Sequence, residues 1–244
     1  MKAVPILFKH EDLIEVFPKA ESFYVFICRE IKKGHIKQIK NGLYALVDPS
    51  TRHIFANKFQ IACQLFDDSY FSYHEALEYY GLANQSFVSR FTYVRAVTSR
   101  NVSFEDVIFS SKVNKCELQI INRMKEEDIR VVSLERALVD SMESPSLAGG
   151  LEEIEYALSS YRFLKLENVV QMLEYYDKAY LYQKAGYLFE KYYGDIFPES
   201  FFNYCLSKIG KKVHYFESKV GSAVLIPKWR LMVSKERELP DELL

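Results

Sequence analysis

The stretch VVSLERALVDSMESPSLAGG, residues 131–150 of a 244-residue chain, places a helical pattern between a β-branched run and two glycines. Apolar residues recur at helical spacing from residue 134 to residue 142, directly after the β-branched run. A strand followed by a helix is therefore predicted. We expect Leu138 to pack against a sheet, with Ala137, Val139 and Leu134 also in the core. Gly149 and Gly150 mark a flexible break after this helix.

The same helix carries three charged residues, Glu135, Arg136 and Asp140. Their pattern permits two interpretations: a structural ion-pair network or a site for a partner. We expect Glu135 and Asp140 to point away from the packed face, because Leu134, Ala137 and Leu138 occupy that face. A surface role then predicts a small effect on stability when Glu135 is replaced.

Both sides of this stretch have patterns typical of an α+β protein. A helix over residues 57–66, a short strand over 70–72 and a helix over 74–80 come first. Residues rich in β-branched and aromatic side chains then predict a small, mostly antiparallel sheet, with strands at 87–98, 102–110, 118–124 and 129–132. The second half is mainly helical, with helices at 151–161, 166–175 and 179–193, late strands at 213–216 and 223–233, and a polar tail.

The first fifty residues predict a winged helix-turn-helix head. A short helix over 10–17 ends before Pro18, and a second helix over 23–33 has Ser22 as its expected N-cap and Gly34 after its end. Its expected buried stripe consists of Phe23, Phe26, Ile27 and Ile31. Asn41-Gly42 between two short strands predicts a hairpin with a type I′ turn, which forms the wing.

A linker at 49–52 separates this head, residues 1–50, from a larger body, residues 51–244.

Charge is segregated along the chain although the net charge is only -1. Residues 22–44 contain five basic residues against Glu30 alone, a balance of +4. Residues 126–199 contain 15 acidic and 7 basic residues, a balance of -8, and residues 208–237 have a balance of +6. Basic side chains on a helix and a hairpin neutralise phosphates. The expected DNA-binding residues are Tyr24, Arg29, Lys32, Lys33, Lys37, Lys40 and Asn41. A solvated charged surface is the alternative.

Catalytic, metal and membrane roles find little support in the sequence. Walker A, dinucleotide-binding, GxSxG, HExxH and kinase motifs are absent. The five histidines are scattered, and the four cysteines are far apart with no CxxC spacing. There is no export signal and no run of 18 apolar residues. We therefore expect a cytoplasmic protein that is not an enzyme and needs no metal or cofactor.

Four stretches together resemble the AbiEi family of antitoxins from abortive-infection toxin-antitoxin systems, which are also regulators of viral (phage) defence. Residues 29–46, REIKKGHIKQIKNGLYAL, resemble the family's recognition helix and wing. Residues 70–85, YFSYHEALEYYGLANQ, resemble a strand, an Ala-Leu helix and a Gly-Leu break. Residues 131–150 resemble the family's Glu-Arg/Lys-Ala-Leu helix with its glycine turn, and residues 185–190, AGYLFE, resemble a Gly-Tyr-Leu patch.

This resemblance implies an antitoxin with a DNA-binding head and an antitoxin body. Such a protein is encoded beside a nucleotidyltransferase-like toxin, neutralises that toxin and represses their operon at an inverted repeat in the promoter DNA. The alternative is a winged-helix transcriptional regulator that stands alone, without a toxin partner.

The sequence departs from the family at its start. Many winged-helix heads of this family carry a full helix before the two predicted here, and Met1 to Lys9 is too short for it. The missing helix weakens the expectation that the head binds DNA. A docking role for the head, or dependence on a dimer or on the basic C-terminal stretch to hold DNA, is the alternative.

Overall fold

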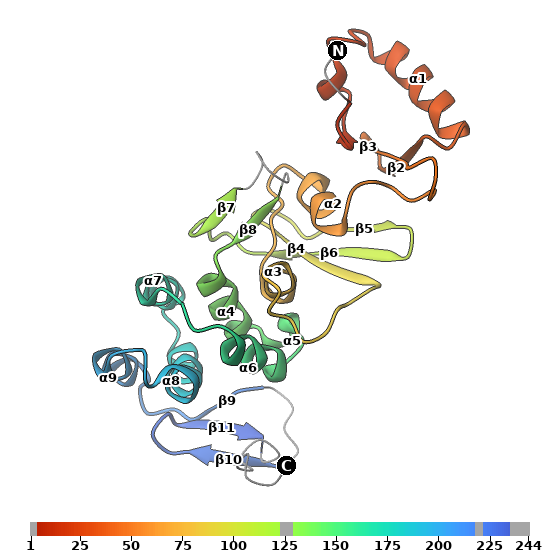
Figure 1. Cartoon of the computed structure of the whole chain (residues 1–244). Helices are drawn as coiled ribbons and strands as arrows, with labels where there is room; N and C mark the ends of the chain where they lie inside the picture. Colours follow the sequence, from red (N-terminus) through yellow and green to blue (C-terminus); the bar gives the residue numbers. More distant parts are fainter. Residues whose placement is uncertain (1–3, 123–128, 218–221, 235–244) are drawn as a thin grey trace. The chain divides into compact units, whose positions relative to one another are not determined.

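The computed structural model describes residues 4–122, 129–217 and 222–234, and it has an α+β fold with a helical second half (Figure 1). The chain forms two compact units: unit 1 comprises Met1–Phe71 and Phe87–Val131, and unit 2 comprises Ser72–Ser86 and Val132–Leu244. The division of the chain at residue 50 stays a prediction. The predicted strand at 118–124, the basic stretch at 208–237 and the polar tail lie partly or wholly outside the described residues.

Unit 1 contains most of the β-structure. Its helical elements are the short 3-10 helix η1 (Glu11–Leu13), α1 (Ala20–Lys32) and α2 (Lys58–Leu65). Its strands are β1 (Leu7–Phe8), β2 (Ile36–Lys40), β3 (Leu43–Leu46), β4 (Arg90–Arg95), β5 (Asn101–Phe104), β6 (Val107–Val113), β7 (Ile120–Asn122) and β8 (Arg130–Val132), which ends at the first residue of unit 2.

The N-terminal head has one α-helix rather than the predicted pair. Residues 10–17 form only the 3-10 helix η1 and turns, because so short a segment gains too few hydrogen bonds to offset helix nucleation. Helix α1 begins at Ala20, with the extended residue Lys19 as its N-cap, so the predicted capping by Ser22 is wrong. Ala20 and Glu21 are good helix formers and extend the helix back toward Pro18.

A small apolar core holds the head together. Phe23 and Ile27 of α1 are buried, whereas Phe26 is partly buried and Ile31 is exposed, so the buried stripe is narrower than predicted. The α1 side chains pack on a three-stranded sheet with the order β1-β3-β2. The core of the head consists of Phe8, Leu13, Phe23, Ile27, Ile36 and Tyr44.

The predicted hairpin is confirmed, but its turn is not of type I′. Gly42 has a positive φ of 80°, whereas Asn41 is not among the residues with positive φ. A type I′ turn needs positive φ at both central residues. The strand register shifts between Gln38 and Lys40 instead, which places a bulge beside the turn. Such a bulge supplies the twist that joins the two strands.

A second sheet of unit 1 has the order β4-β6-β5. Strands β5 and β6 form an antiparallel hairpin, whereas β4 pairs with β6 in parallel. Phe91 of β4 and Phe109 of β6 are buried together with Phe71, and their rings contact one another in an aromatic cluster. Helix α2, capped reciprocally by Asn57 and Gln60, adds Phe59 to this cluster.

Unit 2 is mainly helical (Figure 1). Its helices are α3 (Tyr73–Tyr79), α4 (Leu134–Glu143), α5 (Pro145–Ala148), α6 (Leu151–Ser160), α7 (Leu166–Tyr176), α8 (Ala179–Tyr193) and α9 (Glu199–Lys208). The strands β9 (His214–Tyr215), β10 (Ala223–Ile226) and β11 (Leu231–Ser234) form a sheet with the order β10-β11-β9.

Helix α4 is the centre of unit 2. It packs against α3, α5, α6, α7 and α8, and all nine residues from Leu134 to Met142 are buried. The burial expected for Leu138 is confirmed, because its exposed fraction is 1%. Within unit 2, the elements that pack against α4 are helices, and the packing of Leu138 itself against a sheet stays a prediction. The helical second half folds back on α4 and supplies these neighbours.

The expectation that Glu135 and Asp140 point away from the packed core is wrong. One carboxylate oxygen of Glu135 accepts a hydrogen bond of 2.9 Å from the backbone N–H of Lys165, at the start of α7. Asp140 is completely buried. Helices surround α4 on more than one side, so its polar face is covered as well as its apolar face.

Asp140 is the hub of a buried polar network. Its carboxylate accepts hydrogen bonds from the hydroxyls of Ser72 and Tyr176, each at 2.6 Å, and pairs with Arg136 Nε at 3.2 Å. Burial raises the pKa of Asp140, whereas Arg136 and the two hydroxyls favour the ionised form. The network links the N-cap of α3 and the end of α7 to α4.

Gly186 of α8 is required by close packing. A Cβ atom added at this position would lie 2.1 Å from the ring of Trp229, which is completely buried. The indole N–H of Trp229 donates to Glu190, one turn further along α8, at 2.7 Å. The glycine therefore lets the loop before β11 lie directly on the helix.

We predict that Leu138→Ala lowers the free energy of unfolding by about 2 to 5 kcal/mol, because burial is lost and a cavity remains. Chemical denaturation monitored by circular dichroism measures this change. A loss below about 1 kcal/mol would contradict the packing described for α4.

We also predict that Asp140→Asn lowers the free energy of unfolding by about 3 kcal/mol, since the buried network loses the negative charge that pairs with Arg136. Asp177→Asn is the matched control, because this side chain is 73% exposed and the chemical change is the same. The control is expected to change stability by less than about 0.5 kcal/mol. Equal stability of both variants in urea denaturation would exclude a structural role for the network.

Candidate functional site

One candidate interface is the solvent face of α1. Tyr24 and Val25 are exposed by 47% and 71%, and the Arg29 side chain is exposed by 63%. With Cys28, Lys32 and Lys33 they line a shallow depression on the helix. Four of the predicted DNA-binding residues, Tyr24, Arg29, Lys32 and Lys33, therefore lie together on one surface. On this surface, apolar side chains form a strip, and cationic side chains flank it.

Glu30 organises the charges at the end of α1. One of its carboxylate oxygens accepts from Arg29 and from Lys33, each at 3.0 Å, and the other contacts His35 Nδ1 at 2.8 Å. Hydrogen bonds from His35, Lys33 and Arg29 lower the pKa of Glu30 to about 2. Lys32 takes no part in this cluster of ion pairs. Glu30 therefore offsets part of the positive charge that phosphates would meet.

The predicted wing residues have a different environment. Lys37 forms an ion pair with Glu105, and Lys40 Nζ lies 3.8 Å from the centre of the Phe66 ring. Burial lowers the pKa of Lys40, and the positive charge of Lys9 acts in the same direction. Asn41 is exposed at the hairpin turn. The structure thus groups the α1 residues into one surface and engages Lys37 and Lys40 in contacts within unit 1.

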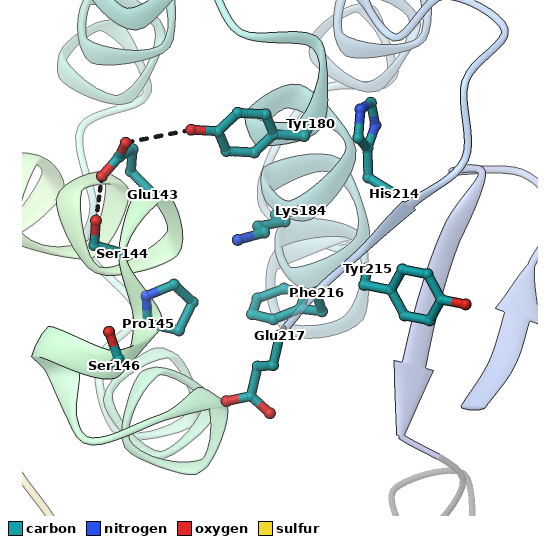
Figure 2. A pocket seen from close by; sticks show the side chains of 10 residues that line it. All are labelled: Glu143, Ser144, Pro145, Ser146, Tyr180, Lys184, His214, Tyr215, Phe216 and Glu217. Atoms are coloured by element: carbon teal, nitrogen blue, oxygen red, sulfur yellow. Dashed lines mark hydrogen bonds between the residues drawn. The ribbon is translucent and has the colours of Figure 1, made fainter. Parts of the chain in front are cut away.

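A second candidate site is a cavity of about 600 Å³ in unit 2, shown in Figure 2. Its walls come from the junction of α4 and α5, from α8, and from β9 with the residues that follow it. The lining residues are Glu143, Ser144, Pro145, Ser146, Tyr180, Lys184, His214, Tyr215, Phe216 and Glu217. Polar and aromatic groups thus converge from segments far apart in the sequence.

Lys184 is the unusual residue of this cavity because it is only 5% exposed. Its ammonium group donates to the main-chain oxygen of Met142 at 2.8 Å, and burial lowers its pKa to about 8. Figure 2 shows its nitrogen pointing into the space between Pro145 and Glu143 on one side and Phe216 on the other.

The neighbouring His214 has a defined tautomer. The side-chain NH₂ of Gln183 donates to the main-chain oxygens of Lys212 and Arg230, which leaves its oxygen to face His214 Nδ1 at 2.6 Å. Nδ1 of the ring therefore carries the hydrogen, and Nε2 of the neutral ring is an acceptor. Burial lowers the pKa of His214, so the neutral form is favoured at pH 7.

This cavity was not predicted from the sequence. A signal was available in α8, where Leu181, Ala185 and Leu188 mark the buried face and Lys184 falls among them at helical spacing. A lysine on an apolar face indicates a buried charge, which is rare unless it has a structural or functional partner. His214 and Phe216 join Lys184 only in the tertiary structure.

Two features are absent from the part of the chain that the structure describes. Within residues 4–122, 129–217 and 222–234, no set of three or more His, Cys, Asp and Glu side chains is placed to hold a metal ion. No helix in these ranges is long and apolar enough to cross a membrane.

Comparisons with known proteins inform the fold rather than the function. No model of a known protein family matches the sequence, and no curated protein matches it. A similar solved structure is the crystal structure of the RV2827C protein from Mycobacterium tuberculosis, with a TM-score of 0.67. The match covers 94% of this chain and 86% of that chain at 15% sequence identity, so the likeness extends over the whole fold.

Proposed function

We propose that this protein is a cytoplasmic DNA-binding antitoxin that represses its own operon and neutralises a nucleotidyltransferase-like toxin. The observation that carries the DNA-binding part is the exposed basic face of α1 followed at once by the β2–β3 hairpin. A helix with an unburied basic face can enter the major groove, and a hairpin beside it can contact the backbone. An inverted repeat in the promoter is the expected target.

The antitoxin part of the proposal is supported by the resemblance of four stretches to AbiEi antitoxins. These stretches correspond to the end of α1 with its hairpin, to α3, to α4 with α5, and to the middle of α8. In the stretch at residues 131–150, Asp140 holds the buried network together. In the stretch at residues 185–190, Gly186 is required because Trp229 packs directly on it. A regulator that stands alone would share the DNA-binding surface but would have no toxin to neutralise.

We predict that Arg29→Ala combined with Lys33→Ala weakens binding to an upstream inverted repeat by at least about tenfold, because phosphate contacts are lost. Gel shifts over a series of salt concentrations measure the affinity and its salt dependence. The slope of log affinity against log salt should become shallower by about 2, one unit for each lost cation.

Two further variants are controls for this experiment. Lys178→Ala with Lys191→Ala removes the same charge from unit 2 and should leave DNA binding unchanged. Glu30→Gln should tighten binding, because Arg29 and Lys33 lose the carboxylate that now offsets them. If Arg29→Ala with Lys33→Ala binds the promoter as tightly as wild type, α1 is not the reading helix.

A second prediction separates the antitoxin from the regulator that stands alone. The full chain carrying Arg29→Ala and Lys33→Ala should still rescue cells that express the neighbouring nucleotidyltransferase-like toxin from an independent promoter, because the body is expected to oppose the toxin. The same variant should no longer repress a reporter driven by the native promoter. Absence of rescue by the wild-type protein would reject the antitoxin role and leave the regulator.

A further inference from the structure

The cavity of unit 2 contains a buried cation without a carboxylate at ion-pair distance in the described part of the chain. The hydrogen-bond acceptor of Lys184 Nζ is the neutral carbonyl of Met142. Other lysines of the same unit differ in this respect: Lys178 pairs with Glu143 at 2.8 Å, and Lys191 pairs with Glu155 at 3.0 Å. Burying an ammonium group beside a neutral partner alone is costly, and a bound anion would offset that cost.

The two carboxylates of the cavity are held by other groups. Glu143 accepts hydrogen bonds from Lys178, from the Ser144 hydroxyl and from the Tyr180 hydroxyl. Glu217 accepts from the backbone N–H of Leu151 at 2.9 Å, at the first residue of α6. Their negative charges still act on Lys184 at longer range, although burial has the larger effect on its pKa. A ligand can therefore reach the ammonium group without displacing an ion pair.

The lining also indicates the kind of anion. Glu143 and Glu217 add negative charge around the cavity, which disfavours a dianion such as a phosphate monoester. Pro145, Phe216 and the ring of Tyr180 provide apolar contact area beside the ammonium group. A volume of about 600 Å³ is in the range of small-molecule sites.

We infer that this cavity binds a small monocarboxylate with an apolar or aromatic body, its carboxylate on Lys184 and its body against Phe216 and Pro145 (Figure 2). Such a ligand replaces the missing counter-charge and covers the aromatic wall. The site belongs to unit 2, whereas α1 belongs to unit 1, so the inference is independent of DNA binding.

The inference predicts how binding depends on pH. A carboxylate binds the ammonium form, so affinity is full below the Lys184 pKa of about 8 and is lost as pH rises through it. Glu143 has a lowered pKa, Tyr180 a raised one, and His214 one below its ordinary value. Among these groups, Lys184 is therefore the one that changes charge between pH 7 and pH 9.5. Glu217 and Tyr215 also line the cavity.

Benzoate is the probe for this site, and isothermal titration calorimetry on the full chain is the measurement. Benzoate should bind at millimolar concentration at pH 7 and at least about tenfold more weakly at pH 9.5, because the ammonium form becomes scarce. Benzamide, which has the same shape without the charge, should not bind. Phenyl phosphate should bind more weakly than benzoate.

Two variants test the role of the residue itself. Lys184→Met preserves most of the side-chain volume and should abolish benzoate binding, whereas Lys191→Met, on the same helix but paired with Glu155, should bind benzoate as wild type does. No binding of 10 mM benzoate to the wild-type protein would overturn the inference. So would equal binding of benzamide, tighter binding of phenyl phosphate, or retained binding by Lys184→Met. The first three outcomes use the wild-type protein and do not depend on the folding of a variant.

Discussion

The helical unit of this protein depends on one buried carboxylate. Asp140 takes hydrogen bonds from Ser72 before α3 and from Tyr176 at the end of α7, and it pairs with Arg136 one turn earlier on α4. A buried charge such as that of Asp140 or Arg136 is costly by itself, and the hydrogen bonds and the ion pair of the network offset that cost. The network therefore specifies how three helices meet, while apolar packing around α4 supplies most of the stability.

The burial of charge also distinguishes the two candidate sites. In the head, Glu30 pairs with Arg29, Lys33 and His35, whose side chains are more than half exposed to solvent, so these ion pairs are weak. A phosphate backbone can compete for these cations. In unit 2, Lys184 is buried beside a neutral acceptor, so solvent screens its charge poorly. Lys184 would therefore attract an anionic ligand more strongly than the exposed cations of the head would.

The stretches that suggested a family contain structural residues in large part. Asp140 and Arg136 hold helices together, and Gly186 makes room for Trp229. Glu190 receives the indole N–H of that tryptophan. Such residues do not by themselves define an activity, so the proposed function rests on the exposed face of α1 and on the resemblance as a whole.

The sequence by itself determined the elements whose signals are local. Helical periodicity located α2, α3, α4 and α6–α8, with α8 at its observed bounds, and Asn41-Gly42 located the hairpin. The helical pattern of the sequence also placed Tyr24, Arg29, Lys32 and Lys33 away from the buried stripe of one helix. The geometry of a single helix is sufficient for that placement. Tertiary structure decided what depends on contacts between distant segments: the burial of Glu135 and Asp140, the ion pair of Lys37, and the cavity around Lys184. Periodicity shows which side of a helix is apolar, but whether the polar side is also covered depends on neighbours that the local pattern does not encode.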